Sequence, residues 1–326
     1  MSDTTTIEWA THSWSPWEGC TKVSAGCANC YAATRNRRFG LDNWGKGKPR
    51  RRTSAAYWKQ PLRWNREASM EFVCGVCQRR GTGEVCMGCG YGACLKARPR
   101  VFPSLCDWLD DEVPITDFAD FLRLIHDTPN LDWLLLTKRP ENFVKRLDKV
   151  WSTLPATDRV HDLIEPWLLR VKFPTNVWLG ASVENQRCAD ERIPQLLRIP
   201  AKLRFLSVEP MLEEVDIRRV PDLMKSFNQS PYGWHNWLRQ RIHWVIVGGE
   251  SGPSARPCNV DWVRGIVRQC QDAGVPCFVK QLGSVINLAQ PGPHGTGFMP
   301  AKLKHPKGGD PAEWPADLQV RQFPTL

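Results

Sequence analysis

The sequence predicts an α/β protein built on a parallel sheet, in the form of a complete or partial (β/α) TIM-type barrel. Short, almost continuous apolar runs alternate with stretches of helical spacing along most of the 326 residues, which is typical of strands covered by helices. Six or seven such runs in one chain fit a barrel better than small domains do. A doubly wound open sheet is the structural alternative.

The elements follow in chain order. A weak strand at 14–17 and a short one at 100–102 precede a helix at 115–126, for which Thr116 is the expected N-cap. The regular part of the pattern comprises strands at 131–137, 176–183, 202–208, 243–249 and 275–280, and helices at 190–197 and 260–274. Gly274 closes the last helix.

Composition changes divide the chain into three parts. The barrel is expected over 1–73 and 95–290, interrupted by a module at 74–94 that is rich in Cys and Gly and lacks a strand or helix period. The segment 291–326, rich in Pro and Gly, is expected to be irregular.

The composition favours a cytoplasmic protein that binds metals and is not in a membrane. No run of about 18 apolar residues is present, and the polar N-terminus resembles no secretory signal. Thirteen cysteines without such a signal are typical of metal ligands rather than disulfides.

The first cysteine group has the spacing Cys-x6-Cys-x2-Cys, at Cys20, Cys27 and Cys30. Three thiolates can ligate three irons of a [4Fe–4S] cluster, which leaves the fourth iron open to a small molecule such as S-adenosylmethionine. Glycines at 19 and 26 suit a loop that bends around such a cluster. The alternative is a zinc site completed by His12.

The second group consists of two Cys-x2-Cys pairs, Cys74 with Cys77 and Cys86 with Cys89. Four thiolates in this pattern predict a zinc-ribbon-like site that stabilises the insertion, with Cys94 as a substitute ligand and an auxiliary iron–sulfur cluster as the alternative. The remaining cysteines (106, 188, 258, 270 and 277) are interpreted as small buried apolar residues.

Polar residues follow the predicted strands. Because the carboxyl ends of barrel strands form the mouth of the site, these residues are candidates for the site, and helix caps or surface charges are the alternative. They are Lys138, Arg139, Ser182, Glu184, Glu209, Glu250 and Lys280, with Asp107 as a further candidate.

The formal net charge is +10, and eight basic residues fall between Arg35 and Arg52. Such a run attracts phosphate, which favours a nucleotide or nucleic acid as substrate, whereas a solvated loop without a partner is the alternative.

The stretch from Trp14 to Ala32 resembles the opening of a largely uncharacterised family of phage- and prophage-associated proteins related to radical S-adenosylmethionine enzymes. The resemblance continues at 135–140, 176–186, 204–210, 244–252 and 280–281. Two features depart from the common pattern of radical enzymes. The cysteines are separated by six and two residues, where three and two are common. The Gly-Gly-Glu at 248–250 follows a late strand, whereas many such enzymes have a similar turn after the second strand. The 74–94 insertion is also unusual for the family.

The resemblance implies a barrel that holds a [4Fe–4S] cluster on Cys20, Cys27 and Cys30, with S-adenosylmethionine at its mouth and an external electron donor. We expect Tyr31 to pack beside the cluster. Ser182, Glu184, Glu209 and Glu250 are expected to bind the cofactor or substrate, and Lys138, Arg139 and Lys280 a carboxylate or phosphate.

Three functions are compatible with these features. The first is a radical enzyme that cleaves S-adenosylmethionine, and the second is a non-catalytic nucleic-acid-binding protein in which both cysteine groups hold zinc. The third, a repair lyase for damaged bases, differs from the first only in its substrate.

Overall fold

The computed structural model describes residues 5–74, 76–77, 79–81, 86, 88–89, 94–96, 98–221, 223–224, 233–292 and 295–325. Only the backbone is described at 80, 94–96, 289–292 and 295–300. About half of the insertion predicted at 74–94 lies outside these residues.

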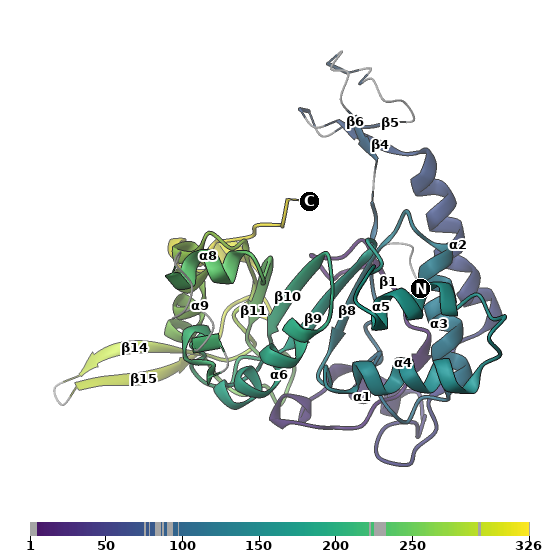
Figure 1. Cartoon of the computed structure of the whole chain (residues 1–326). Coiled ribbons are helices and arrows are strands. Elements are labelled where there is room, and N and C mark those ends of the chain that lie inside the picture. The colour runs from purple at the N-terminus through teal and green to yellow at the C-terminus, as the bar shows by residue number, and fades with distance from the viewer. Residues whose placement is uncertain are drawn as a thin grey trace.

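A parallel sheet of seven strands forms the centre of the molecule (Figure 1). Its order is β1 (His12–Ser13), β7 (Arg100–Phe102), β8 (Asp132–Thr137), β9 (Val177–Ser182), β10 (Leu203–Val208), β11 (Trp244–Gly248) and β13 (Cys277–Gln281). The sheet curls into a half-barrel. Within the described residues β1 and β13 lie at opposite edges of the sheet and do not pair with each other. Of the two predicted forms, the structure therefore has the partial barrel and not the complete TIM barrel.

The helices are α1 (Tyr31–Arg38), α2 (Ala55–Met70), α3 (Ile115–Asp127), α4 (Asn142–Thr153), α5 (His161–Leu168), α6 (Gln186–Arg198), α8 (Gly233–Arg239) and α9 (Val260–Ala273). Short 3-10 turns cover Ala25–Cys27, Ile217–Arg219, Pro311–Glu313 and Ala316–Leu318. The N-cap of α3 is Pro114 and not the expected Thr116. Gly274 ends α9 as predicted, with φ at 65° in the left-handed region that glycine adopts without strain.

Every second residue of the strands faces the concave side of the sheet. Near the amino ends these positions carry large apolar side chains, which form a separate buried cluster that includes Trp178, Phe205, Trp244 and Phe278. Gly180 makes room for this cluster, because a Cβ there would lie 2.3 Å from the Phe205 ring. When every second position is followed toward the carboxyl end of each strand, the sequence reaches Lys138, Ser182, Glu209, Glu250 and Lys280. The two-residue period of a strand therefore places the backbone positions of these residues on the concave side.

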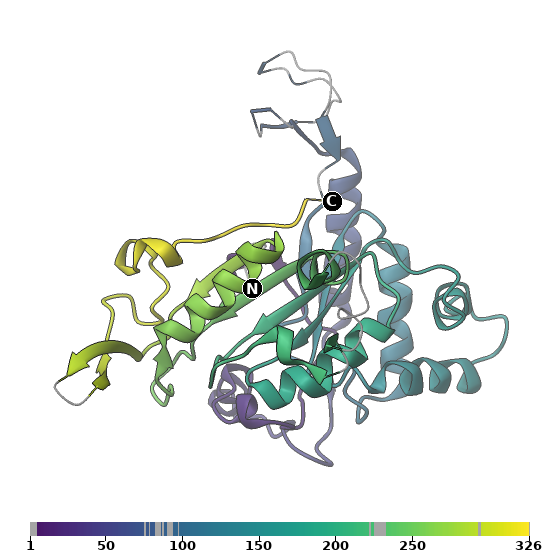
Figure 2. The same ribbon diagram turned by 60° about the vertical axis from the view of Figure 1, so that its left-hand side comes forward.

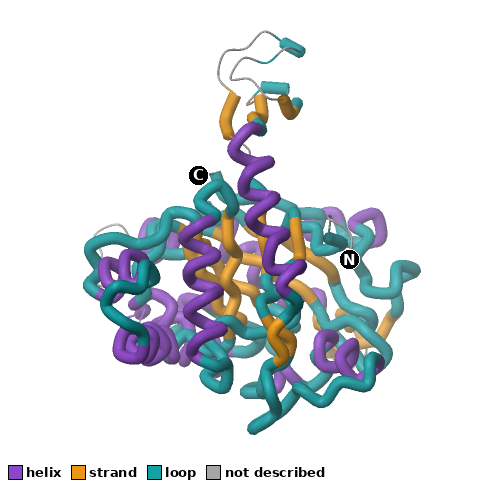
Figure 3. The backbone as a smooth tube through the Cα atoms, turned by 90° about the vertical axis from the view of Figure 1, so that its right-hand side faces the viewer, coloured by secondary structure: helices purple, strands orange, loops and turns teal. Residues whose placement is uncertain are grey.

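The cysteine-rich insertion stands at the tip of α2, away from the sheet (Figure 3). It contains strands, which the sequence did not predict: β4 (Phe72–Cys74) pairs antiparallel with β5 (Arg80–Gly81) and with β6 (Cys94–Lys96). The insertion precedes the amino end of β7, so it lies at the opposite end of the sheet from the carboxyl ends of the strands (Figure 1).

The C-terminal segment is also more regular than predicted. Strands β14 (Ile286–Gly292) and β15 (Gly295–Ala301) form an antiparallel hairpin that projects from the body, and β14 also pairs with β12 (Cys258–Asn259) (Figure 2). The predicted boundary between 290 and 291 thus falls inside a strand. A two-stranded antiparallel ladder, β2 (Trp17–Glu18) with β3 (Arg51–Arg52), closes the segment that contains the first cysteine group. No helix among the described residues is long and apolar enough to span a bilayer.

Candidate active site

The three cysteines of the first group lie on one loop at the carboxyl ends of the strands. Cys20 follows β2, Cys27 ends a 3-10 turn, and Cys30 immediately precedes α1. All three line an open cavity of about 160 Å³. The opposite wall of this cavity contains Phe102, Thr137 and Ser182, the last residues of β7, β8 and β9. The fold thus brings the cysteine loop and the strand ends together.

Two carboxylates from distant strands hold this loop. The Ser24 hydroxyl donates a hydrogen bond to Glu184, whose other oxygen accepts from Arg192 at 2.7 Å. Gly26 passes so close to Glu184 that a Cβ there would lie 2.8 Å from its carboxylate. Glu184 is fully buried, and these contacts fix the loop against β9.

Glu250 braces the same loop from β11. Its carboxylate accepts from the Asn29 side chain at 3.0 Å and forms a two-point ion pair with Arg256. Arg256 in turn donates to the carbonyl oxygen of Ala25 at 3.0 Å. In this structure Glu184 and Glu250, which we expected to contact the cofactor, contact the cysteine loop.

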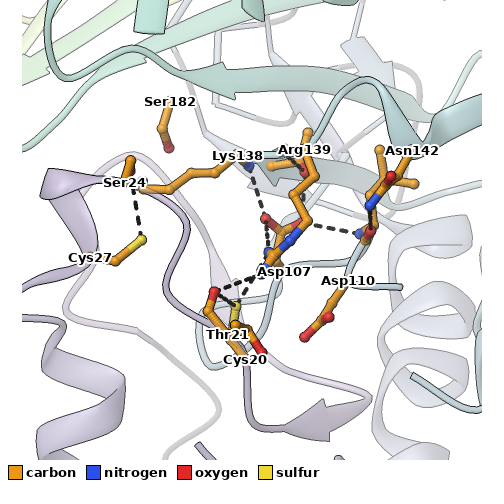
Figure 4. A network of polar contacts seen from close by, with 12 residues as sticks. Cys20, Thr21, Ser24, Cys27, Asp107, Asp110, Lys138, Arg139, Asn142 and Ser182 are labelled. Atoms are coloured by element: carbon orange, nitrogen blue, oxygen red, sulfur yellow. Dashed lines mark hydrogen bonds and ion pairs between the residues drawn. The ribbon is translucent and has the colours of Figure 1, made fainter. Parts of the chain in front are cut away.

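Arg139 and Asp107 form a buried ion pair under Cys20 (Figure 4). The Arg139 guanidinium lies 3.0 Å from Asp107 and donates to the Thr21 carbonyl at 2.6 Å and to the Cys20 sulfur at 3.5 Å. Asp107 also accepts from the Thr137 hydroxyl at 2.6 Å and from the Lys138 backbone N–H at 2.9 Å. Arg139 is therefore committed to the loop and has few donors left for a ligand.

Arg50 is a second buried clamp, and sequence reasoning missed it. Its side chain is fully buried, 2.8 Å from Asp110, and donates to the Thr21 hydroxyl at 2.6 Å. In the sequence Arg50 is one of a run of basic residues, and no local signal separates it from its exposed neighbours.

Most of that basic run is neutralised within the fold. Five of its eight side chains form ion pairs: Arg35, Lys48, Arg50, Arg51 and Arg52. Within the described part of the chain, Arg37, Arg38 and Lys46 form none, and all three are exposed. The free positive charge is thus much smaller than the sequence indicates.

The side chains of two polar residues of the cavity form no hydrogen bond or close ion pair among the described residues, although the Lys138 charge helps to lower the pKa of Glu184. Lys138 makes no ion pair there, and it also lines an adjoining, more polar cavity of about 430 Å³. The Ser182 hydroxyl, in a residue only 2% exposed, points toward the space between Ser24 and Lys138 (Figure 4). Lys280, by contrast, pairs with Glu209 at 3.0 Å. Lys138 and Ser182 are thus available to a ligand.

The environment of the thiols favours their neutral form when no metal is bound. Burial, reinforced by Asp107, raises the pKa of Cys20 to about 12, although Arg139 opposes the shift. Burial also raises the pKa of Cys30. Because metal ligation requires thiolates, binding at this site must release protons.

The spacing of the sulfur atoms indicates which metal group fits. The three sulfurs are not gathered within 4.8 Å of one another, as the ligand atoms of a single ion would be. Thiolates on separate irons of a cluster lie farther apart than thiolates on one zinc ion. His12, the alternative zinc ligand, stacks on Trp64 with ring centroids 4.0 Å apart. As they lie in this structure, the three thiols and His12 are therefore not gathered as the ligands of a single zinc ion.

Comparison with protein families gives one match. Residues 4–305 match a family described as "Protein of unknown function (DUF5131)". The chain belongs to this family. No curated protein and no solved structure matches it. The match agrees with the expectation of a largely uncharacterised family, and its description mentions neither phages nor radical S-adenosylmethionine enzymes.

This DUF5131 protein also contains a compact group of four cysteines in the insertion. The ligand atoms of Cys74, Cys77, Cys86 and Cys89 all lie within 4.8 Å of one another, so they could hold a metal ion such as zinc. The sulfur atoms of Cys74 and Cys89 are 3.6 Å apart, and those of Cys77 and Cys86 are 3.4 Å apart. Four thiolates arranged tetrahedrally at zinc-ligand distance would lie about 3.8 Å apart.

Backbone N–H groups support these sulfurs. Those of Cys77 and Val76 donate to Cys74, and that of Gly88 donates to Cys86, each at 3.4 Å. Donation from Cys77 is the main reason that the pKa of Cys74 is lowered to about 6. Cys94 pairs with Cys74 through its backbone, but its side chain lies outside the described residues. This second group is a candidate metal site, and none of its residues lines the cavity.

Proposed function

We propose that this protein is a radical S-adenosylmethionine enzyme related to those of phages and prophages. Cys20, Cys27 and Cys30 would hold a [4Fe–4S] cluster, which when bound supplies the electron that cleaves the cofactor into a carbon radical and methionine. The observation that carries the proposal is the location of these thiols. They line one cavity at the carboxyl ends of a parallel half-barrel, opposite the two free polar groups Ser182 and Lys138.

The loop is held for such a role. Glu184, Glu250, Arg139 and Arg50 each bind its backbone or side chains, so the three sulfurs are positioned by elements from across the sheet. Rigid support of the ligands is what a metal site requires if it is to keep one coordination position open. These four residues are positioning residues in this proposal.

The free groups of the cavity would bind the cofactor. The Lys138 ammonium is suited to the cofactor carboxylate, and the Ser182 hydroxyl to its ribose or amino group. Glu209 and Lys280 hold each other at 3.0 Å and would open toward a polar substrate group only by breaking this pair.

Iron binding tests the proposal directly. Cys27→Ala should remove most of the iron and sulfide from anaerobically reconstituted protein, because a cluster loses affinity when one of three thiolates is missing. Cys270→Ala, a buried cysteine of α9, is the matched control and should keep both. Iron content and visible absorbance are the measurements, followed by detection of 5′-deoxyadenosine with reductant. Full iron content in the Cys27 variant would reject the assignment, and zinc alone in the intact protein would favour the non-catalytic alternative.

We further propose that the four-cysteine group holds zinc. Its sulfur separations of 3.4 and 3.6 Å support a single tetrahedral ion rather than an auxiliary cluster. Its place at the other end of the sheet indicates a structural role away from the reaction (Figure 1).

The proposed substrate is a nucleotide or nucleic acid. Arg37 and Arg38, both exposed and without ion pairs in the described structure, directly precede the exposed Phe39 at the end of α1, whose first turn lines the cavity. The Arg35 guanidinium lies 5.0 Å from the centre of the Phe39 ring. A cationic patch beside an aromatic ring suits a single strand. Arg37→Glu with Arg38→Glu should weaken binding of a labelled single-stranded oligonucleotide about tenfold or more and flatten its salt dependence. The exposed pair Arg187→Glu with Arg198→Glu on α6 is the control, and equal losses in both would contradict a specific patch.

A further inference from the structure

A fourth thiol faces the cavity of the cluster loop. Apart from Cys94, five cysteines lie outside the two groups. Cys188, Cys258, Cys270 and Cys277 are buried, whereas Cys106 is partly accessible and lines the cavity with Cys20, Cys27 and Cys30. Cys106 follows β7, and a parallel bridge with Gly19 brings it beside the start of the cysteine loop. Cys106 packs against the hydrophobic core, as its interpretation as a small apolar residue predicts, but it is only partly buried and also lines the cavity.

The same cavity shows a second sign that it is built for a ligand. Ser182 is only 2% exposed, and its hydroxyl points into this space and forms no hydrogen bond within the described structure (Figure 4). A buried hydroxyl without a protein partner is costly unless a ligand or water satisfies it. A molecule that satisfies Ser182 would occupy the space that Cys106 also lines.

We infer that Cys106 donates a hydrogen atom to a carbon radical formed in this cavity, an inference that rests on the proposed function. During turnover the acceptor would be the radical left on the substrate after the cofactor-derived radical has taken its hydrogen. The S–H bond breaks, a C–H bond forms, and the unpaired electron moves to the Cys106 sulfur. One electron from the external reductant and one proton from solvent then restore the thiol.

The chemistry of a thiol suits this step. An S–H bond is weaker than an aliphatic C–H bond, so transfer to a carbon radical is downhill, and an ordinary cysteine is protonated at neutral pH. A positioned donor also outcompetes donors in solution through its high effective concentration. If Cys106 ligated the cluster instead, four thiolates would close the open iron, and cofactor cleavage would not occur there.

Deuterium transfer tests the inference without a known substrate. Reconstituted protein is incubated with dithionite and S-adenosylmethionine in D2O, where exchangeable thiols carry deuterium and face the cofactor-derived radical. We expect 5′-deoxyadenosine with one deuterium, and a labelled fraction about tenfold lower in Cys106→Ser and Cys106→Ala, because the positioned donor is gone. Cys270→Ser should match the wild type. Equal labelling in all variants, or none in the wild type, would overturn the inference.

Two further measurements separate this inference from the proposed function. In the cluster-free protein a small alkylating reagent should modify Cys106 at least about tenfold faster than the buried Cys270, as expected for a thiol with access to solvent. Equal rates would overturn the inference whatever the cluster does. Iron loss in Cys106→Ser as complete as in Cys20→Ser would also overturn it and make Cys106 a ligand. Absence of 5′-deoxyadenosine from every variant would instead defeat the proposed function, and the inference with it.

Discussion

At the scale of single residues, buried charged side chains fix the position of the cysteine loop. Arg139 and Arg50 converge on Thr21, the residue after Cys20, and both arginines are paired with buried aspartates. Charged groups remain buried only when their hydrogen bonds are satisfied. The position of the loop is therefore coupled to the Asp107 and Asp110 carboxylates.

Replacement of Arg139 tests this coupling. Arg139→Met should lower the free energy of unfolding by about 3–5 kcal/mol, because it leaves Asp107 as a buried charge without its partner. Arg187→Met on α6 is the matched control, since that side chain is 71% exposed and lies 3.8 Å from Glu191. The control should change by less than about 0.5 kcal/mol. Denaturant unfolding of the metal-free proteins is the measurement, and similar losses in both variants would contradict a special role for Arg139.

At the scale of elements, large apolar side chains fill the concave side of the half-barrel near the amino ends of the strands, whereas the cavity lies at the carboxyl ends. Trp178, Gly180 and Ser182 follow one another on the concave side of β9. The first belongs to the aromatic cluster and the last lines the cavity. Side-chain size along one strand thus decides where the cavity begins.

Gly180 is the position on β9 where the Phe205 ring leaves no room for a side chain. Gly180→Ala should destabilise the protein by about 1–3 kcal/mol, because the new methyl group would overlap the Phe205 ring in a packed core. Gly265→Ala, in the interior of α9 with nothing within 4 Å, is the control and should stabilise by about 0.5–1 kcal/mol. Thermal unfolding would compare the two, and a neutral Gly180 variant would show that Phe205 can move away.

At the scale of the whole molecule, the two cysteine groups are at opposite ends of the sheet (Figure 1). The insertion rests on α2 and shares no lining residue with the cavity. Metal binding at one site should therefore leave the other unchanged.

Removal of the second metal tests this separation. Cys77→Ser with Cys89→Ser should abolish zinc binding and raise hydrogen exchange in β4 and β6, because a module without an apolar core depends on its metal. The rates of hydrogen exchange in β8 to β10, and the iron content of the first cysteine group, should equal those of the unsubstituted protein. Metal analysis and exchange mass spectrometry are the measurements. Loss of iron in this variant would show that the two sites are coupled.

Periodic elements were predictable because their signals are local. The strands expected at 131–137, 176–183, 202–208 and 243–249 appear as β8 to β11 within one residue at each end, and the cysteine spacings marked both candidate metal sites. The β14–β15 hairpin and the strands of the insertion were missed, because Gly- and Pro-rich segments lack the period that identifies strands.

The sequence by itself determined the parallel α/β architecture and the residues that can ligate metal, since alternation and ligand spacing act over a few residues. Only the tertiary structure decided that the sheet stays an open half-barrel and that Glu184 and Glu250 brace the cysteine loop. It also decided that Arg50 is buried while Arg37 is exposed and forms no ion pair within the described structure. Ser24 meets Glu184 across 160 residues and Asn29 meets Glu250 across 221. Contacts over such separations depend on how the elements pack, which no local pattern encodes.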